Sequence, residues 1–281
     1  MSRWRSVRLI LGRDLAARRR AAVITASITV GIAVAAIAVV ALTTEGQVRP
    51  MSGHEADRVL GYIGMMTLMF ALVFTGQVIT EGVAEEKRSR VVEVVLGAVS
   101  PRDLLIGKAA AIGLIGLMEV VLLGAAVAAA GIVLDVFPLP RATPGALAAV
   151  LGFFLLGFAF YATVYGAAGA MVAPHENPAN GVIPVNLMIM IGYVAGVVSL
   201  GGGGGGFLRV LSLLPPTAPL TMPLRIAFGE APGWEIGLAA LLTGGAACGT
   251  IVLAGRLYAG ALLRGGKVGW RQAWRDAAHL G

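Results

Sequence analysis

The stretch that decides the fold is residues 109–133, which read AAAIGLIGLMEVVLLGAAVAAAGIV. Glu119 is its one ionisable side chain. About 20 apolar residues in a helix cover the roughly 30 Å of hydrocarbon in a bilayer, because a helix rises about 1.5 Å per residue. Inside hydrocarbon every backbone N–H and C=O must be bonded, which a helix achieves by itself. We therefore expect this stretch to be a transmembrane helix.

Apolar blocks of similar length recur along the whole chain. Of its 281 residues, 57% are hydrophobic and only 13% are charged, whereas a soluble domain carries about 25% charged residues. The sequence therefore predicts an all-α polytopic membrane protein with a single transmembrane domain over residues 21–257. Its six transmembrane helices are expected at about residues 21–42, 59–79, 109–133, 145–172, 182–200 and 236–257.

Three further segments complete the predicted architecture. Residues 1–20 place apolar side chains at helical spacing among seven arginines, which is typical of a helix lying in the membrane interface. Residues 207–225 are apolar but broken by four prolines, so we expect re-entrant or interfacial helices before the last span. Residues 258–281 form a basic tail.

The Lys and Arg residues give the orientation. If the N-terminus is cytoplasmic, seventeen of the 22 Lys and Arg residues fall on the cytoplasmic side and five fall outside. Short cytoplasmic loops carry such an excess, so we expect both termini in the cytoplasm and the chain in a bacterial inner (plasma) membrane, among its lipids. The net charge of +7 follows from this topology, and nucleic acid is not an expected partner.

A charged segment, residues 81–104, lies between the second and third expected spans. Its apolar residues from Val91 to Val99 follow the spacing of one helix face, and Ser100-Pro101-Arg102-Asp103 is typical of the start of a new helix. Two interpretations are open from this pattern: an amphipathic helix resting on the membrane, or a docking element for a soluble partner.

A resemblance to a known family favours the docking element. The run from Gly82 to Leu96, followed by Val99-Ser100-Pro101 and Gly107-Lys108, resembles the signature of type-2 ABC transporter permeases. It is most similar to their sodium-efflux, NatB-like branch. Residues 209–225 and the tail from Leu262 to Arg275 are similar as well, so the resemblance covers roughly residues 59–275.

The resemblance implies the membrane-spanning permease subunit of an exporter, with a cytoplasmic coupling helix between the second and third spans. Such permeases form homodimers or paired permeases on ATP-binding cassette ATPase subunits, which hold the ATP and Mg. The residues that would meet the ATPase are Glu81, Glu85, Glu86, Lys87, Arg88 and Arg90. The exported substrate would be sodium or a small molecule.

Two features depart from the sodium-efflux branch. Its members usually carry a large extracellular domain between the first two spans, and here that connection is only about Thr43–Arg58. A six-glycine run, Gly201–Gly206, stands where an ordinary loop is normal, and such a run has no fixed conformation of its own. The missing extracellular part argues against sodium as the exported substrate.

Three polar side chains inside expected spans are candidates for the transport path. They are Glu119, Gln77 and Asn186. An ionisable group at the bilayer centre costs at least a few kcal/mol, so Glu119 is expected to line a cavity or to bond a neighbouring helix. Gln77 and Asn186 are more often interhelical hydrogen bonds. Arg209 and Arg225, which flank the proline-broken segment, are expected to reach the lipid headgroups.

The sequence indicates no enzyme. It lacks the G-x-x-x-x-G-K-[ST] phosphate loop, and with three His residues in the chain a metal site or a catalytic triad is hard to build. We therefore expect no catalytic, cofactor-binding or metal site on this chain. Two alternatives to an exporter subunit are a self-contained ion-coupled secondary transporter, with Glu119 as the coupling group, and a membrane scaffold without transport activity.

Overall fold

The computed structural model of the chain describes residues 53–89, 101–133, 144–173, 176–200 and 205–262. Every regular element within these ranges is a helix. The predicted interfacial helix 1–20, the first span 21–42, the apolar helix face at 91–99 and the tail beyond Leu262 lie outside the described residues. The described helices are α2 (Gly53–Ser89), α4 (Pro101–Val133), α5 (Pro144–Met171), α6 (Pro178–Gly181), α7 (Ile183–Leu200), α8 (Gly205–Leu213), α9 (Ala218–Ala227) and α10 (Gly233–Leu262).

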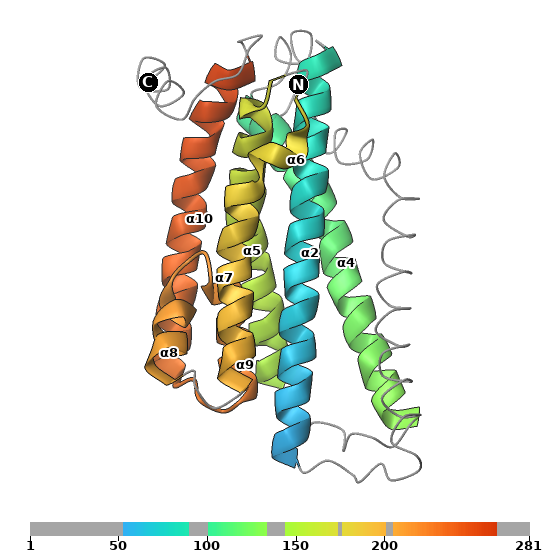
Figure 1. The fold of residues 1–281 in the computed structure, drawn as a ribbon, viewed down its shortest axis with the longest axis vertical. Helices are drawn as coiled ribbons and strands as arrows, with labels where there is room; N and C mark the ends of the chain where they lie inside the picture. Colours follow the sequence, from blue (N-terminus) through green and yellow to red (C-terminus); the bar gives the residue numbers. More distant parts are fainter. Residues whose placement is uncertain (1–52, 90–100, 134–143, 174–175, 201–204, 263–281) are drawn as a thin grey trace.

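The long helices α2, α4, α5, α7 and α10 run alongside one another, and the short helices lie toward the two ends of this bundle (Figure 1). One end, here the α6 end, holds the last turns of α2, α5 and α10, the starts of α4 and α7, and α6 itself. The opposite end, here the α8 end, holds α8, α9 and the starts of α2, α5 and α10. The chain thus alternates between two ends, as a polytopic membrane protein must.

Three of these helices are long and apolar enough to cross a membrane. Their apolar stretches are Gly61–Glu85, Ala148–Met171 and Gly233–Leu253, and shorter apolar helices occupy Ala110–Ala126 and Ile183–Ser199. All five coincide with expected spans. The number of six spans and the positions of the termini stay predictions.

Prolines mark where helices begin, but the first charged residues do not mark where a helix ends. α4 begins at Pro101 and α5 at Pro144, where the sequence predicts helix starts, since proline suits the first helical turn. α2, in contrast, does not stop at the first charged residues but continues through Glu81 to Ser89. Glu, Lys and Arg are good helix formers, so a charged stretch extends the helix beyond the apolar block.

The centre of the bundle is α5, which packs most extensively against α10 and α2. Its aromatic residues Phe154, Tyr161 and Tyr165 are almost fully buried. Close approach to α2 depends on Gly169: a Cβ added there would lie 2.8 Å from the carbonyl oxygen of Thr80. A small residue that lets two backbones approach is the usual way helices associate in a membrane, where lipid offers no hydrophobic drive.

α8 and α9 form a helix–turn–helix across the proline-rich segment; α9 packs against α2 and α5, and α8 packs against α7 and α10, in the lower half of Figure 1. Tyr161 on α5 donates a hydrogen bond to the carbonyl of Pro216 in the connecting turn. Thr217 Oγ1 donates to the carbonyl of Leu211, 2.5 Å away, which satisfies a group at the end of α8. Gly205 and Gly206 lie in the first turn of α8, so the last part of the six-glycine run is helical rather than free.

One hydroxyl joins α2 to α5, and its removal gives a first prediction. Thr80 Oγ1 lies 3.1 Å from the carbonyl oxygen of Tyr165 on α5 and 3.1 Å from that of Gly76 on its own helix. Interhelical side-chain hydrogen bonds in membranes contribute about 0.6 kcal/mol on average. Thr80→Val should therefore lower the free energy of unfolding by about 0.6 kcal/mol, measured by unfolding in micelles of increasing SDS content.

The matched control is Thr67→Val on the same helix. Thr67 Oγ1 donates only to the carbonyl of Ile63, four residues back on α2, so its loss breaks no contact between helices. We expect Thr67→Val to change the free energy of unfolding by less than Thr80→Val. Equal losses for the two variants would show that the Thr80–Tyr165 bond does not stabilise the bundle.

Candidate functional site

The acids at the α6 end lie on one face of α2. Glu81 and Glu85 are exposed, and Gln77, one turn earlier, is half-buried. Residues four apart on a helix are neighbours, so the three side chains form a line from the bundle toward the end of α2. Glu86, Lys87 and Arg88 belong to the last turns of α2, although their side chains are not described, and Arg90 lies outside the described residues.

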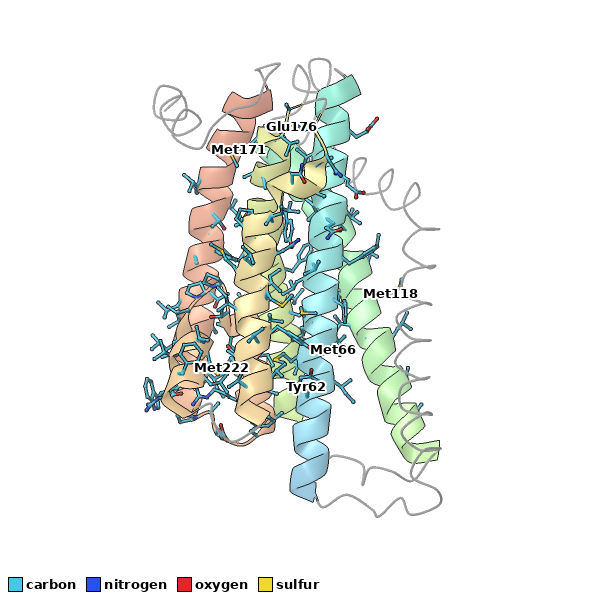
Figure 2. The ribbon with its side chains drawn as sticks, viewed as in Figure 1. Tyr62, Met66, Met118, Met171, Glu176 and Met222 are labelled. Carbon is cyan, nitrogen blue, oxygen red and sulfur yellow. The ribbon has the colours of Figure 1, made fainter. Side chains whose placement is uncertain are left out.

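The connection between α5 and α7 lies beside this line. α6 is a single turn whose N-cap is Asn177, and the Asn177 side chain accepts a hydrogen bond from the backbone N–H of Ala179, 3.0 Å away. α6 contacts α2, and Glu176 precedes it at the same end of the molecule (Figure 2). The surface of the α6 end is thus built from the end of α2 and from the α5–α7 connection together.

The three transport-path candidates have different surroundings. Asn186 on α7 accepts a hydrogen bond from the hydroxyl of Tyr165 on α5, with 2.5 Å between the two oxygens. The ring of Tyr165 also covers Gly76 on α2, so this tyrosine lies between α2, α5 and α7. Glu119 lies in α4, but its side chain is not described. The interhelical bond of Asn186 is the arrangement that the sequence favoured for it.

A second polar contact joins α2 and α7 nearer the α8 end. The hydroxyl oxygens of Tyr62 and Tyr193 are 2.7 Å apart, and both side chains are half-buried. Figure 2 places Tyr62 in the lower half of α2, with Met66 one turn above it. Met66 and Phe70 are exposed on the same side of α2 as Tyr62 and Gln77. This face therefore runs from a tyrosine pair through apolar side chains to the acids.

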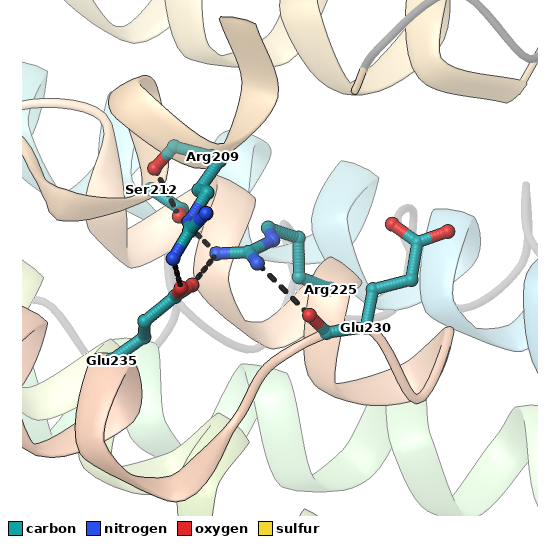
Figure 3. A network of polar contacts seen from close by, with 5 residues as sticks. All are labelled: Arg209, Ser212, Arg225, Glu230 and Glu235. Atoms are coloured by element: carbon teal, nitrogen blue, oxygen red, sulfur yellow. Dashed lines mark hydrogen bonds and ion pairs between the residues drawn. The ribbon is translucent and has the colours of Figure 1, made fainter. Parts of the chain in front are cut away.

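The most developed polar cluster of the described residues lies where α8, α9 and α10 meet (Figure 3). Glu235, two residues into α10, is only 1% exposed and bonds two arginines. Its Oε2 is 2.6 Å from Arg225 Nη1 on α9, and its Oε1 is 2.5 Å from Arg209 Nη2 on α8. One carboxylate thus holds three helices together.

Arg225 is the centre of this cluster. Its guanidinium also donates to Ser212 Oγ at 2.8 Å and to the carbonyl oxygen of Glu230 at 2.9 Å. A buried charge is tolerated only when its hydrogen bonds are satisfied, and Arg225, whose side chain is 6% exposed, meets that condition. The expectation that Arg225 reaches the lipid headgroups is therefore wrong, because α9 turns it inward toward Glu235. Arg209 is half-exposed and keeps access to the surface.

Sequence reasoning missed Glu235. The expected span began at residue 236, which left the acid just outside, whereas α10 begins at Gly233. A usable signal was present: two arginines in an apolar segment need a counter-ion, and Glu235 is an acid close to that segment. In the described part of the chain, no three His, Cys, Asp or Glu side chains gather as a metal site would require.

Comparison with known proteins defines the family. Residues 21–256 match the family described as ABC-2 family transporter protein. The chain is also 26% identical over 256 residues to the uncharacterized protein YhaP of Bacillus subtilis (strain 168), a match that covers 84% of this chain and 60% of YhaP. The chain therefore spans about three fifths of that relative's length. No solved structure matches it.

The family match covers most of the chain, including all the helices described above except the last six residues of α10. It agrees with the long apolar helices, and its range includes the residues between Gly82 and Lys108. The chain belongs to the ABC-2 family of transporter proteins, multi-pass membrane proteins that form the permease component of ABC transporters.

Proposed function

We propose that this chain is the permease subunit of an ATP-driven exporter, with the α6 end in the cytoplasm. The family match is the observation that carries this proposal. ATP would be hydrolysed by separate cassette subunits, because the chain has no phosphate loop of its own. Two copies, or two related permeases, would enclose the path. The assignment to the sodium-efflux branch stays a prediction.

The partner surface in this proposal is the end of α2. α2 is a single helix from Gly53 to Ser89, and it contacts α5, α7 and α9. A force that the ATPase subunit applies to the charged last turns of α2 would therefore be transmitted along this helix to the rest of the bundle. Glu81 and Glu85 are exposed on these turns. Exposed acids at this end of α2 offer a negative surface that complements basic groups on a soluble subunit.

The face of α2 from Tyr62 to Gln77 is the proposed transport surface. Its exposed or half-buried side chains are mostly apolar, with Met66 and Phe70 between the two polar ends. A bare cation needs a shell of oxygen ligands to replace its water, and this face offers few of them. We therefore favour an apolar or amphipathic small molecule over sodium as the substrate.

Charge reversal tests the coupling. The chain, co-expressed with its ATPase subunit and purified as a complex, should lose the partner when Glu81 and Glu85 are both replaced by lysine. Repulsion at a charged interface should weaken the complex by about tenfold or more, which corresponds to about 1.4 kcal/mol. The measurement is the dissociation constant of the ATPase subunit, together with substrate-stimulated ATP hydrolysis in proteoliposomes.

Glu230→Lys is the matched control. Glu230 is an exposed acid at the α8 end, and its carboxylate points away from Arg225 in Figure 3. The same reversal there should leave the affinity for the ATPase subunit unchanged. Two results would contradict the proposal: full coupling in the Glu81 and Glu85 variant, or substrate transport by the chain in proteoliposomes that contain no ATPase.

A further inference from the structure

An exposed apolar face covers α8 and the first turns of α10. On α8 and just beyond it, the exposed apolar side chains are at positions 207, 210 and 214, and on α10 they are at positions 234, 238 and 241. Spacings of three and four residues place each set on one side of its helix. Phe207 is 64% exposed and Trp234 is 60% exposed, which is far more than a water-facing surface would favour for such side chains. This outer apolar face consists of Phe207, Val210, Leu214, Trp234, Leu238 and Leu241.

The position of this face relative to the bilayer follows from α10. The apolar stretch of α10 begins at Gly233, so Trp234 stands at the boundary between the hydrocarbon and the headgroups. Tryptophan is enriched at that boundary because its ring is apolar and its N–H is polar. α8 packs against α10 here and presents an apolar side outward, as an interfacial helix does.

A positive charge lies at the edge of the outer apolar face, beside Trp234. The guanidinium carbon of Arg209 is 5.8 Å from the centroid of the Trp234 ring, and the Arg209 side chain is 53% exposed. Arg209 shares Glu235 with Arg225, and the other partners of Arg225, Ser212 and the Glu230 carbonyl, are neutral. The cluster therefore holds two positive charges and one negative charge, and Arg209 is the member that reaches the surface.

We propose that the outer apolar face, with Arg209 at its polar edge, binds an anionic phospholipid in the leaflet at the α8 end. The guanidinium of Arg209 has planar donors that suit a phosphate, and Glu235 occupies only part of them. The acyl chains lie over the apolar side chains of α8 and α10. A free phosphate would gain nothing from these side chains, which is why the occupant is a lipid.

Charge also argues against a second copy of the chain as the occupant. A two-fold contact places the same patch of each subunit against the other. Here that contact would set Arg209, with the uncompensated positive charge of its cluster, against the same arginine of the other copy, and like charges facing each other disfavour the contact. This lipid site goes beyond the proposed function, since it requires only that α10 lies in a membrane, and it stands or falls separately from ATP coupling.

Quenching of Trp234 fluorescence tests the lipid site. The chain has four tryptophans, so the other three are replaced by phenylalanine in the full-length protein. The protein is reconstituted into bilayers that contain a brominated phosphatidylglycerol or a brominated phosphatidylcholine, and quenching is measured against the fraction of brominated lipid. One arginine at a membrane surface should favour the anionic lipid by about fivefold in apparent affinity.

Three variants define the outcome. Arg209→Gln should abolish the fivefold preference, and Arg209→Lys should keep part of it, because lysine retains the charge without the planar donors. Arg256→Gln, which removes an arginine from the other end of α10, should keep the full preference. Quenching by the brominated phosphatidylcholine in Arg209→Gln shows that Trp234 still contacts the bilayer. Loss of the lipid preference in this variant would then not result from unfolding.

Each contrary result overturns the proposal. Equal quenching of the parent protein by both lipids means that the face has no headgroup preference. A preference that survives in Arg209→Gln assigns it to another residue. Absence of quenching by either lipid means that another copy of the chain covers the face. Relief of quenching by inorganic phosphate at millimolar concentration means that the site takes a free anion rather than a lipid.

Discussion

Arg225→Met is expected to lower the free energy of unfolding by about 3–5 kcal/mol, because it removes one partner from a buried ion pair. The guanidinium donates to Glu235, Ser212 and the Glu230 carbonyl, so its loss leaves three acceptors with fewer partners. Methionine fills a similar length without any donor. Equilibrium unfolding of the solubilised chain in mixed micelles of increasing SDS content, followed by tryptophan fluorescence, measures the change.

Arg209→Met is the matched control for that prediction. It makes the same substitution on the other arginine bound to Glu235, but this side chain is 53% exposed, so water and headgroups compensate for the lost pair. An exposed ion pair contributes at most about 1 kcal/mol. If the two variants lost the same stability, burial would not be the reason that the Arg225–Glu235 pair is the stronger of the two; if neither lost stability, the cluster would not join α8, α9 and α10.

The second large effect is expected at Gly169, where α5 approaches the backbone of α2. A Cβ at this position would lie 2.8 Å from the carbonyl oxygen and 3.1 Å from the Cα of Thr80. Both are backbone atoms, which cannot rotate away as a side chain does. Gly169→Val should therefore force the two helices apart at a cost of about 3 kcal/mol, at the upper end of what overpacking usually costs.

Gly152→Val gives the control on the same helix. A Cβ added at Gly152 would meet nothing within 4 Å, so valine there changes helix propensity without a clash. We expect the free energy of unfolding to stay within about 0.5 kcal/mol of the parent value. A small loss at Gly169 would mean that α2 and α5 separate easily, and α5 would then not be the rigid centre of the bundle.

Much of the helical layout was predictable because it depends on local chemistry. The expected span 145–172 corresponds to α5, Pro144–Met171, and the expected span 182–200 corresponds to α7, Ile183–Leu200. Block length fixes that an apolar stretch is a helix, and proline fixes where the helix starts. Boundaries set by charge were less accurate: α2 runs on to Ser89, and α10 extends from Gly233 to Leu262.

The polar contacts were less predictable because their partners are distant in the sequence. That Asn186 bonds another helix could be expected from its type, but the choice of Tyr165 on α5 as its partner depends on how α5 and α7 pack. The role of residues 81–104 in meeting an ATPase stays a prediction, and so does any role of Glu119 in transport. Both rest on the family resemblance or on the cost of a charge in lipid.

The sequence by itself thus determined a chain of apolar helices with a charged segment after the second expected span, because apolar length, proline positions and charge distribution are read residue by residue. Only the tertiary structure decided what the proline-broken segment does with its arginines. α8 and α9 fold back against α10, so Arg225 is buried on Glu235 while Arg209 remains at the surface. The physical reason is that a charge in an apolar environment is stable only beside its counter-ion. Helix packing places the Glu235 carboxylate against Arg225 in the interior and against Arg209 at the surface.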